Sequence, residues 1–205
     1  MLGILNKIFG GNKSEKDVKK ILPVVDTINQ FFNQYQSLTN DQLRAKTAEF
    51  RNRIQEHLQS VDAEIARKKA EAENLDSNDI AARDEAYREM DELKKTRDSK
   101  IEEILEKILP EAFAVVKETA RRFTNNETVA STATDLDREL AAQRPNIIIE
   151  GDQAIYKNTW QAAGGTVTWN MVHYDVQLIG GTVLNSGKIA EKAKVDGEAL
   201  ESRLN

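Results

Sequence analysis

The chain of 205 residues contains no cysteine, and its only histidines are His57 and His173. The absence of cysteine excludes disulfide bonds and thiolate metal sites, and it is compatible with a reducing cytoplasm. Two histidines cannot build a histidine-rich metal cluster within one chain, so we expect each of them to be a core or surface residue. The sequence therefore predicts no metal site.

Long apolar runs are also missing. A helix that spans a bilayer needs about 18 or more consecutive apolar residues, and no such run occurs. The first residues lack the long hydrophobic region and small-residue cleavage site of a secretory signal. The 34 acidic residues outnumber the 29 basic residues, and the resulting net charge of −5 argues against a general nucleic-acid-binding protein.

What the sequence does contain is helical periodicity over most of its first half. With 40% apolar residues the chain can bury a core. Apolar residues at helical spacing predict a helix over residues 15–37, with a kink or restart at Pro23. Thr39 and Gln42 form a capping-box pattern that begins a long helix, and a turn at residues 74–79 leads into a return helix over residues 80–108. Pro110 suits the first turn of a further helix.

The two long helices are dense in glutamate, lysine and arginine around a narrow apolar seam. This pattern is typical of antiparallel helices that mainly contact each other. A solvated helical hairpin and a specific docking surface are both consistent with it.

In the last third of the chain the sequence pattern changes from helical to one typical of β-strands. After a loop at residues 124–128 and a short helix around residues 135–143, the β-branched run at residues 147–149 predicts a strand. Residues 154–156 should pair with it, and residues 166–169 should form another strand after a glycine turn. We expect Trp160 and Trp169 to be packing residues.

Near the N-terminus an apolar cluster surrounds one lysine at helical spacing. Its residues are Leu2, Ile4, Leu5, Lys7, Ile8 and Phe9. Such a segment can lie in a membrane interface, with the following lysines near anionic lipid headgroups. From the residues alone, packing on the body of the protein or on a second copy is an equal alternative, which leaves a homodimer open.

The stretch at residues 173–184 reads H-Y-D-V-Q-L-I-G-G-T-V-L. A glutamine amide carries a donor and an acceptor side by side, as the N6/N7 edge of adenine requires. Gln177 is therefore a candidate adenine reader, and Tyr174 a candidate to stack on the ring. The alternative is that the apolar residues of this stretch are core and Gln177 is a surface amide. We expect a short helix over residues 177–184 and a strand over residues 188–191.

This stretch resembles the adenine-reading motif of SecA, the ATP-driven motor of bacterial preprotein translocation. Residues 1–9, 28–53 and 109–116 resemble the opening region of the same family, in the same order. The resemblance implies that Met171, Tyr174 and Gln177 contact adenine, that ATP and Mg²⁺ are the family's cofactors, and that the SecY channel and preproteins are its partners. It also implies a cytoplasmic protein held peripherally at the inner face of the cell membrane, and it favours lipid contact for the N-terminal cluster.

The resemblance weakens where the family's phosphate-binding loop belongs. In an ungapped alignment Glu198 occupies the position of the phosphate-binding lysine, Ala199 that of the Mg²⁺-binding threonine, and Val195 that of a glycine. A carboxylate there repels a triphosphate. We therefore expect weak or no binding of ATP, no ATP hydrolysis by this chain alone, and no catalytic residue within it.

The predicted fold is mainly α with a small β portion, in four parts. Residues 1–54 form N-terminal amphipathic and packing helices, 55–108 a helical hairpin insertion, 109–145 a helix and linker, and 146–205 a partial α/β nucleotide-binding domain. Two functions remain open at this point. The chain is either a truncated or degenerate N-terminal region of a SecA-type motor or a noncatalytic helical interaction module.

Overall fold

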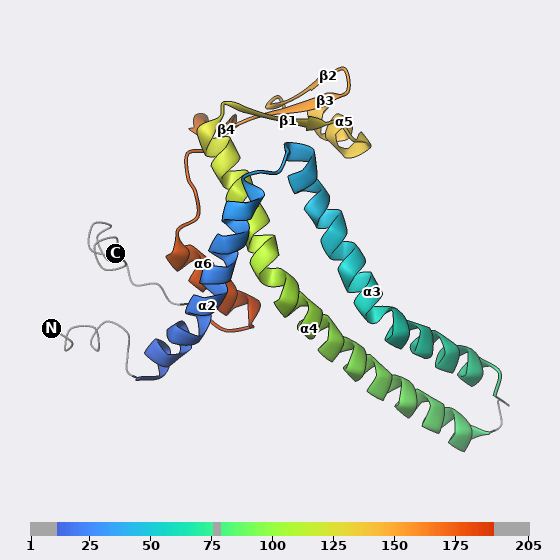
Figure 1. Ribbon diagram of the computed structural model, residues 1–205. Helices are drawn as coiled ribbons and strands as arrows, with labels where there is room; N and C mark the ends of the chain where they lie inside the picture. The colour runs from blue at the N-terminus through green and yellow to red at the C-terminus, as the bar shows by residue number, and fades with distance from the viewer. Residues whose placement is uncertain (1–11, 76–78, 191–205) are drawn as a thin grey trace.

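The computed structural model describes residues 12–75 and 79–190, and within them the chain is mainly helical (Figure 1). The helices are α2 (Asn12–Tyr35), α3 (Asn40–Glu73), α4 (Ile80–Asn125), α5 (Asp135–Ala141) and α6 (Asp175–Asn185). The strands are β1 (Thr128–Thr132), β2 (Ile147–Glu150), β3 (Gln153–Lys157), β4 (Thr159–Ala162) and β5 (Gly165–Thr168). The predicted class, mainly α with a small β portion, is confirmed. No helix among the described residues is both long and apolar enough to cross a membrane.

Helices α3 and α4 form the predicted antiparallel hairpin, which projects away from the rest of the molecule (Figure 1). The capping box at its start is present, because the Thr39 side chain accepts from the Gln42 N–H and the Gln42 side chain accepts from the Thr39 N–H. Arg97 donates to Asp62 across the two helices at 2.6 Å, and Lys68 pairs with Glu89. These pairs lie at the solvent-exposed surface of the hairpin, so they contribute little to its stability.

The prediction of a new helix at Pro110 is wrong. Helix α4 runs without a break from Ile80 to Asn125 and includes Pro110 in its interior. A proline inside a helix removes one backbone hydrogen bond and crowds the preceding turn. Here α2 and α3 both pack against α4, and the neighbouring Glu111 accepts hydrogen bonds from Tyr35 of α2 and Arg53 of α3. Tertiary contacts therefore offset the local penalty.

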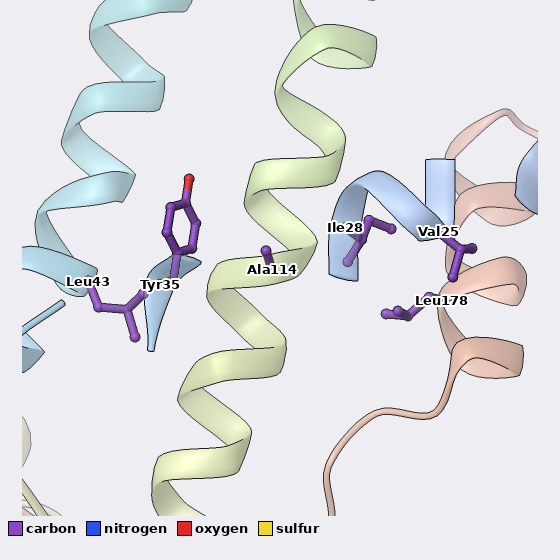
Figure 2. Close-up of a cluster of buried hydrophobic side chains, with 6 residues drawn as sticks. All are labelled: Val25, Ile28, Tyr35, Leu43, Ala114 and Leu178. Atoms are coloured by element: carbon purple, nitrogen blue, oxygen red, sulfur yellow. The ribbon is translucent and has the colours of Figure 1, made fainter. Parts of the chain in front are cut away.

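The hydrophobic core lies where α2, α4 and α6 meet, with Leu43 added from α3 (Figure 2). Its buried members are Val25, Ile28, Tyr35, Leu43, Ala114 and Leu178. Ala114 is completely buried, and its small side chain lets α2 approach α4. The apolar residues at helical spacing in α2 are thus explained by packing against two other helices.

The strands form two small antiparallel sheets. The first has the order β1-β3-β2, with Ala130 opposite Ile155 and Ile148 opposite the same residue on the other side. The second is the β4–β5 hairpin, with Trp160 opposite Val167. Strand β1 was not predicted, because its sequence Thr-Val-Ala-Ser-Thr has little apolar character. It forms because β3 pairs with it along its whole length.

A buried polar cluster fastens the first sheet to α3. The Asp137 carboxylate, fully buried, accepts from Arg44 Nη2 at 2.6 and 2.8 Å, from the Thr134 N–H and hydroxyl, and from the Tyr156 hydroxyl. Burial alone raises the pKa of Asp137, but the hydrogen bonds from Arg44, Tyr156 and Thr134 outweigh it and hold that pKa well below its usual range. Burial and the adjacent Asp137 raise the pKa of Tyr156 to about 12.

The depressed pKa of Asp137 predicts a specific loss of stability in acid. Its contribution is fully present above the ordinary carboxyl value of 3.8 and is lost as the pH falls toward the lower folded-state pKa. We expect the difference in unfolding free energy between the natural chain and Asp137→Asn to stay constant down to about pH 5 and to shrink below about pH 4. Urea titrations at several pH values measure this difference. A difference that stays constant down to about pH 2.5 would contradict the prediction.

Candidate functional site

The candidate adenine-reading motif lies at the start of α6. Tyr174 is the residue before the first turn, and the Gln177 side chain bends back so that its Oε1 accepts from the Tyr174 N–H at 2.8 Å. The Gln177 amide nitrogen lies 3.9 Å from the Met171 sulfur. The structure therefore brings Met171, Tyr174 and Gln177 together, with Tyr174 60% exposed and Met171 38% exposed.

Two longer helices hold this motif in place. Asp175 accepts from Asn29 of α2 at 3.1 Å and from Lys117 of α4 at 3.4 Å. Lys117 also donates to Asn29 at 2.8 Å, and its ammonium group lies 5.0 Å from the centre of the Phe32 ring. Lys117 is buried and Asp175 is exposed, so this network links α2, α4 and α6 at the edge of the protein interior.

Close packing explains one glycine of the motif's Gly-Gly pair. A Cβ placed on Gly181 would come within 3.0 Å of the Phe113 ring, whereas one on Gly180 would meet nothing within 4 Å. Gly181 thus allows α6 to lie directly against α4. The segment before α6 is held as well, because the Thr124 hydroxyl donates to the Met171 carbonyl at 3.1 Å.

The Gln177 side-chain amide still has hydrogen-bonding groups available for a ligand. The Gln177 oxygen is already bound to the Tyr174 N–H but retains a second lone pair, and its –NH₂ group has donors beyond the contact with the Met171 sulfur. A purine edge could therefore still bind both atoms of the amide. Within the described ranges 12–75 and 79–190, no group of three or more histidine, aspartate or glutamate side chains is placed to hold a metal ion.

Some of the predicted functional residues lie outside the described part of the chain. The lipid-contact candidates Leu2, Ile4, Leu5, Lys7, Ile8 and Phe9 lie outside the described residues, as do Val195, Glu198 and Ala199 of the altered phosphate loop. We predicted a strand at residues 188–191. The structure describes residues 188–190 of this segment, and they do not form a strand. A strand needs a paired neighbour, and the described sheets end at β5, well before this segment.

Sequence reasoning missed the residues that position the motif. Asn29 and Lys117 are separated from Asp175 by 146 and 58 residues, so no local pattern connects them. Arg121 and Arg122 form a charged pair near the end of α4, and Arg122 is buried. The one available signal was a lysine inside the apolar stretch of residues 113–120.

Comparison with known proteins places the chain in a family. The model of the SecA DEAD-like domain matches residues 5–204. The protein translocase subunit SecA of Porphyromonas gingivalis strain W83 is 46% identical over 200 residues, which cover 98% of this chain and 18% of that protein. The SecA subunit of Christiangramia forsetii is 46% identical over 198 residues, covering 97% and 18% respectively.

A third relative extends the match to the whole chain. The SecA subunit of Amoebophilus asiaticus is 44% identical over 204 residues, covering 100% of this chain and 18% of that protein. The chain thus spans less than a fifth of the length of these relatives. No solved structure matches it significantly. The family match over nearly every residue shows that the chain belongs to the SecA family.

Proposed function

We propose that this chain is the N-terminal part of a SecA-type translocation motor and supplies the adenine side of its nucleotide site. Met171, Tyr174 and Gln177 contact the base, with the Gln177 amide bound to its edge. The observation that carries this proposal is the fixed position of Gln177, whose oxygen binds the Tyr174 N–H while its nitrogen lies beside Met171. An amide held in this way has lost most of its rotamer freedom before the base arrives.

By itself the chain holds the base without the phosphates and does not hydrolyse ATP. In the family, a lysine, backbone amides and Mg²⁺ bind the phosphates, and these contacts supply much of the affinity. Glu198 and Ala199 replace two of the residues required. The SecY channel, preproteins and an anionic lipid surface at the inner face of the membrane are the partners that membership in the family supports for the whole motor. The four-part division at residues 54, 108 and 145 belongs to the same proposal.

Calorimetry with ATP–Mg²⁺ and with adenosine tests this function. We expect no binding tighter than roughly the millimolar range, and similar affinities for the two ligands, because the phosphates add little here. Micromolar binding of ATP–Mg²⁺, or a large preference for it over adenosine, would show that the phosphates are bound after all. Steady turnover of ATP would overturn the proposal entirely.

A conservative variant separates base recognition from folding. Gln177→Glu keeps an oxygen for the Tyr174 N–H but replaces the amide donor. Millimolar binding of adenosine should therefore be lost while α6 remains folded. NMR titration with adenosine measures both. Gln153→Ala, an exposed glutamine on β3, is the matched control and should bind adenosine normally. Equal binding by Gln177→Glu and the natural chain would remove Gln177 from the site.

The alternative function, a noncatalytic helical interaction module, has some support near the tip of the hairpin. Ile80 is 70% exposed and Tyr87 is 50% exposed there, on a surface otherwise rich in charge. In this case Gln177→Glu changes nothing, whereas charge reversal along residues 64–69 weakens partner binding. The adenosine titration therefore also distinguishes the two functions.

A further inference from the structure

An apolar cavity of about 430 Å³ lies at the sheet end of α4. It is bounded by the last turns of α4, by β3 and β4, and by the segment that precedes α6. The side chains that shape it are Val116, Phe123, Tyr156, Trp160, Trp169 and His173. Its size and apolar walls are those of a ligand pocket. Because Trp160 and Trp169 are the only tryptophans of the chain, its whole tryptophan fluorescence originates here.

Two residues of this cavity carry buried nitrogens without a partner. Trp169 Nε1 and His173 Nδ1 are both shielded from water, and neither has a hydrogen-bond partner in the described part of the chain. An unpaired buried polar group of this kind is unfavourable. Both residues line the cavity, so a ligand bound there contacts their rings.

The apolar cavity continues into a polar groove. A second cavity of about 510 Å³ shares Asn146 and Trp160 with the first, and it adds Gln143, Arg144 and Gln161. Histidine aside, the ionisable side chains of lysine, arginine, aspartate and glutamate type that line the two cavities are Lys157 in the first and Arg144 in the second. Both are basic. An occupant of the combined site therefore has an apolar part, a polar part and acidic groups.

We propose that this site docks an extended acidic peptide segment that carries one large apolar side chain. The apolar side chain enters the cavity between Trp160 and Trp169, and the neighbouring carboxylates lie near Arg144 and Lys157. An extended peptide fits better than a compact ligand, because it presents side chains of different chemistry along its length and carbonyl oxygens between them. This interaction does not depend on adenine binding at α6.

Tryptophan fluorescence of the full chain tests the proposal directly. The probe is an acetylated peptide of about eight residues with one central phenylalanine among glutamates and glycines. We expect a saturable change in emission below about 1 mM peptide, and a loss of at least about tenfold in affinity when the phenylalanine is replaced by alanine. A peptide with lysines in place of the glutamates should also bind at least about tenfold more weakly.

A pair of variants on one helix locates the site. Val116→Glu places a carboxylate at the cavity wall, where Val116 is 53% exposed, and should weaken binding by at least about tenfold. Leu105→Glu introduces the same charge on α4 outside both cavities, at a residue that is 42% exposed, and should bind normally. Equal effects of the two variants, or no fluorescence change up to about 1 mM peptide, would overturn the proposal. Tighter binding of dodecanoate than of the peptide would overturn it too, in favour of a lipid-like ligand.

Discussion

Replacing Asp137 with alanine should lower the free energy of unfolding by about 2 to 4 kcal/mol, because donors that bind the buried carboxylate lose their acceptor at about 1 to 3 kcal/mol each. The carboxylate is completely buried, and three different elements depend on it. Its loss leaves the Arg44 guanidinium without its acceptor at 2.6 Å and leaves the Thr134 N–H and Tyr156 hydroxyl without their shared partner. Urea unfolding, followed by tryptophan fluorescence at the sheet end and by circular dichroism, measures the loss.

The matched control is Asp135→Ala, two residues earlier in the same helix. Asp135 is exposed in the first turn of α5, so its replacement should cost only about 0.3 to 1 kcal/mol through the helix dipole. The double variant Arg44→Ala/Asp137→Ala should cost less than the sum of the single variants, because the two side chains share one interaction. Additive costs, or equal losses for Asp135→Ala and Asp137→Ala, would show that the cluster is not cooperative.

The second large effect is expected for Arg122→Met, about 2 to 4 kcal/mol, because each buried acceptor that loses its donor costs about 1 to 3 kcal/mol. The buried guanidinium donates to the Tyr35 and Leu38 carbonyls at 3.2 and 2.7 Å, and to Asn40 at 2.5 Å. These groups form the end of α2 and the start of α3, where helix carbonyls lack partners within their own helix. Methionine retains the apolar volume but removes the donor to the Leu38 carbonyl and to Asn40, whereas the Tyr35 carbonyl keeps the Leu38 N–H. Thermal and urea unfolding both measure this change.

Arg121→Met separates this role from simple charge pairing. Both arginines bind the fully buried Glu118, Arg121 at 2.7 and 2.8 Å and Arg122 at 2.8 Å. Burial by itself raises the pKa of Glu118, but its hydrogen bonds to the two arginines outweigh this effect and keep the pKa below the usual range. Because Arg121 donates only to Glu118 among the interactions described, its loss should cost about 1.5 kcal/mol. If both variants lose the same stability, the cross-link to α2 contributes nothing.

Local sequence was sufficient wherever a short-range rule governs the structure. The capping box at Thr39 and Gln42 fixed the start of α3 to the residue, since both hydrogen bonds join groups three residues apart. The motif containing Gln177 was predicted as a short helix, and α6 forms there. In the candidate adenine site, Met171, Tyr174 and Gln177 lie close together because they belong to one short segment of the chain.

Long-range contacts account for what the sequence did not reveal. Local rules end a helix before Pro110, but packing from α2 and α3 carries α4 through it. Val116 belongs to a short apolar run of α4 and is still 53% exposed, since it faces the open cavity. The partners of Asp175 lie on helices far away along the chain, and no periodicity signals them.

By itself, then, the sequence determined the helical hairpin, the class of fold, the family resemblance and the position of the adenine motif. Each of these depends on residues that are close along the chain or on matched segments. The tertiary structure alone decided which charges are buried, which helix continues through its proline, and where an apolar cavity meets a polar groove. The physical reason is that burial and electrostatics depend on neighbours in space, and these neighbours come together only when α2, α4, α6 and the sheets pack.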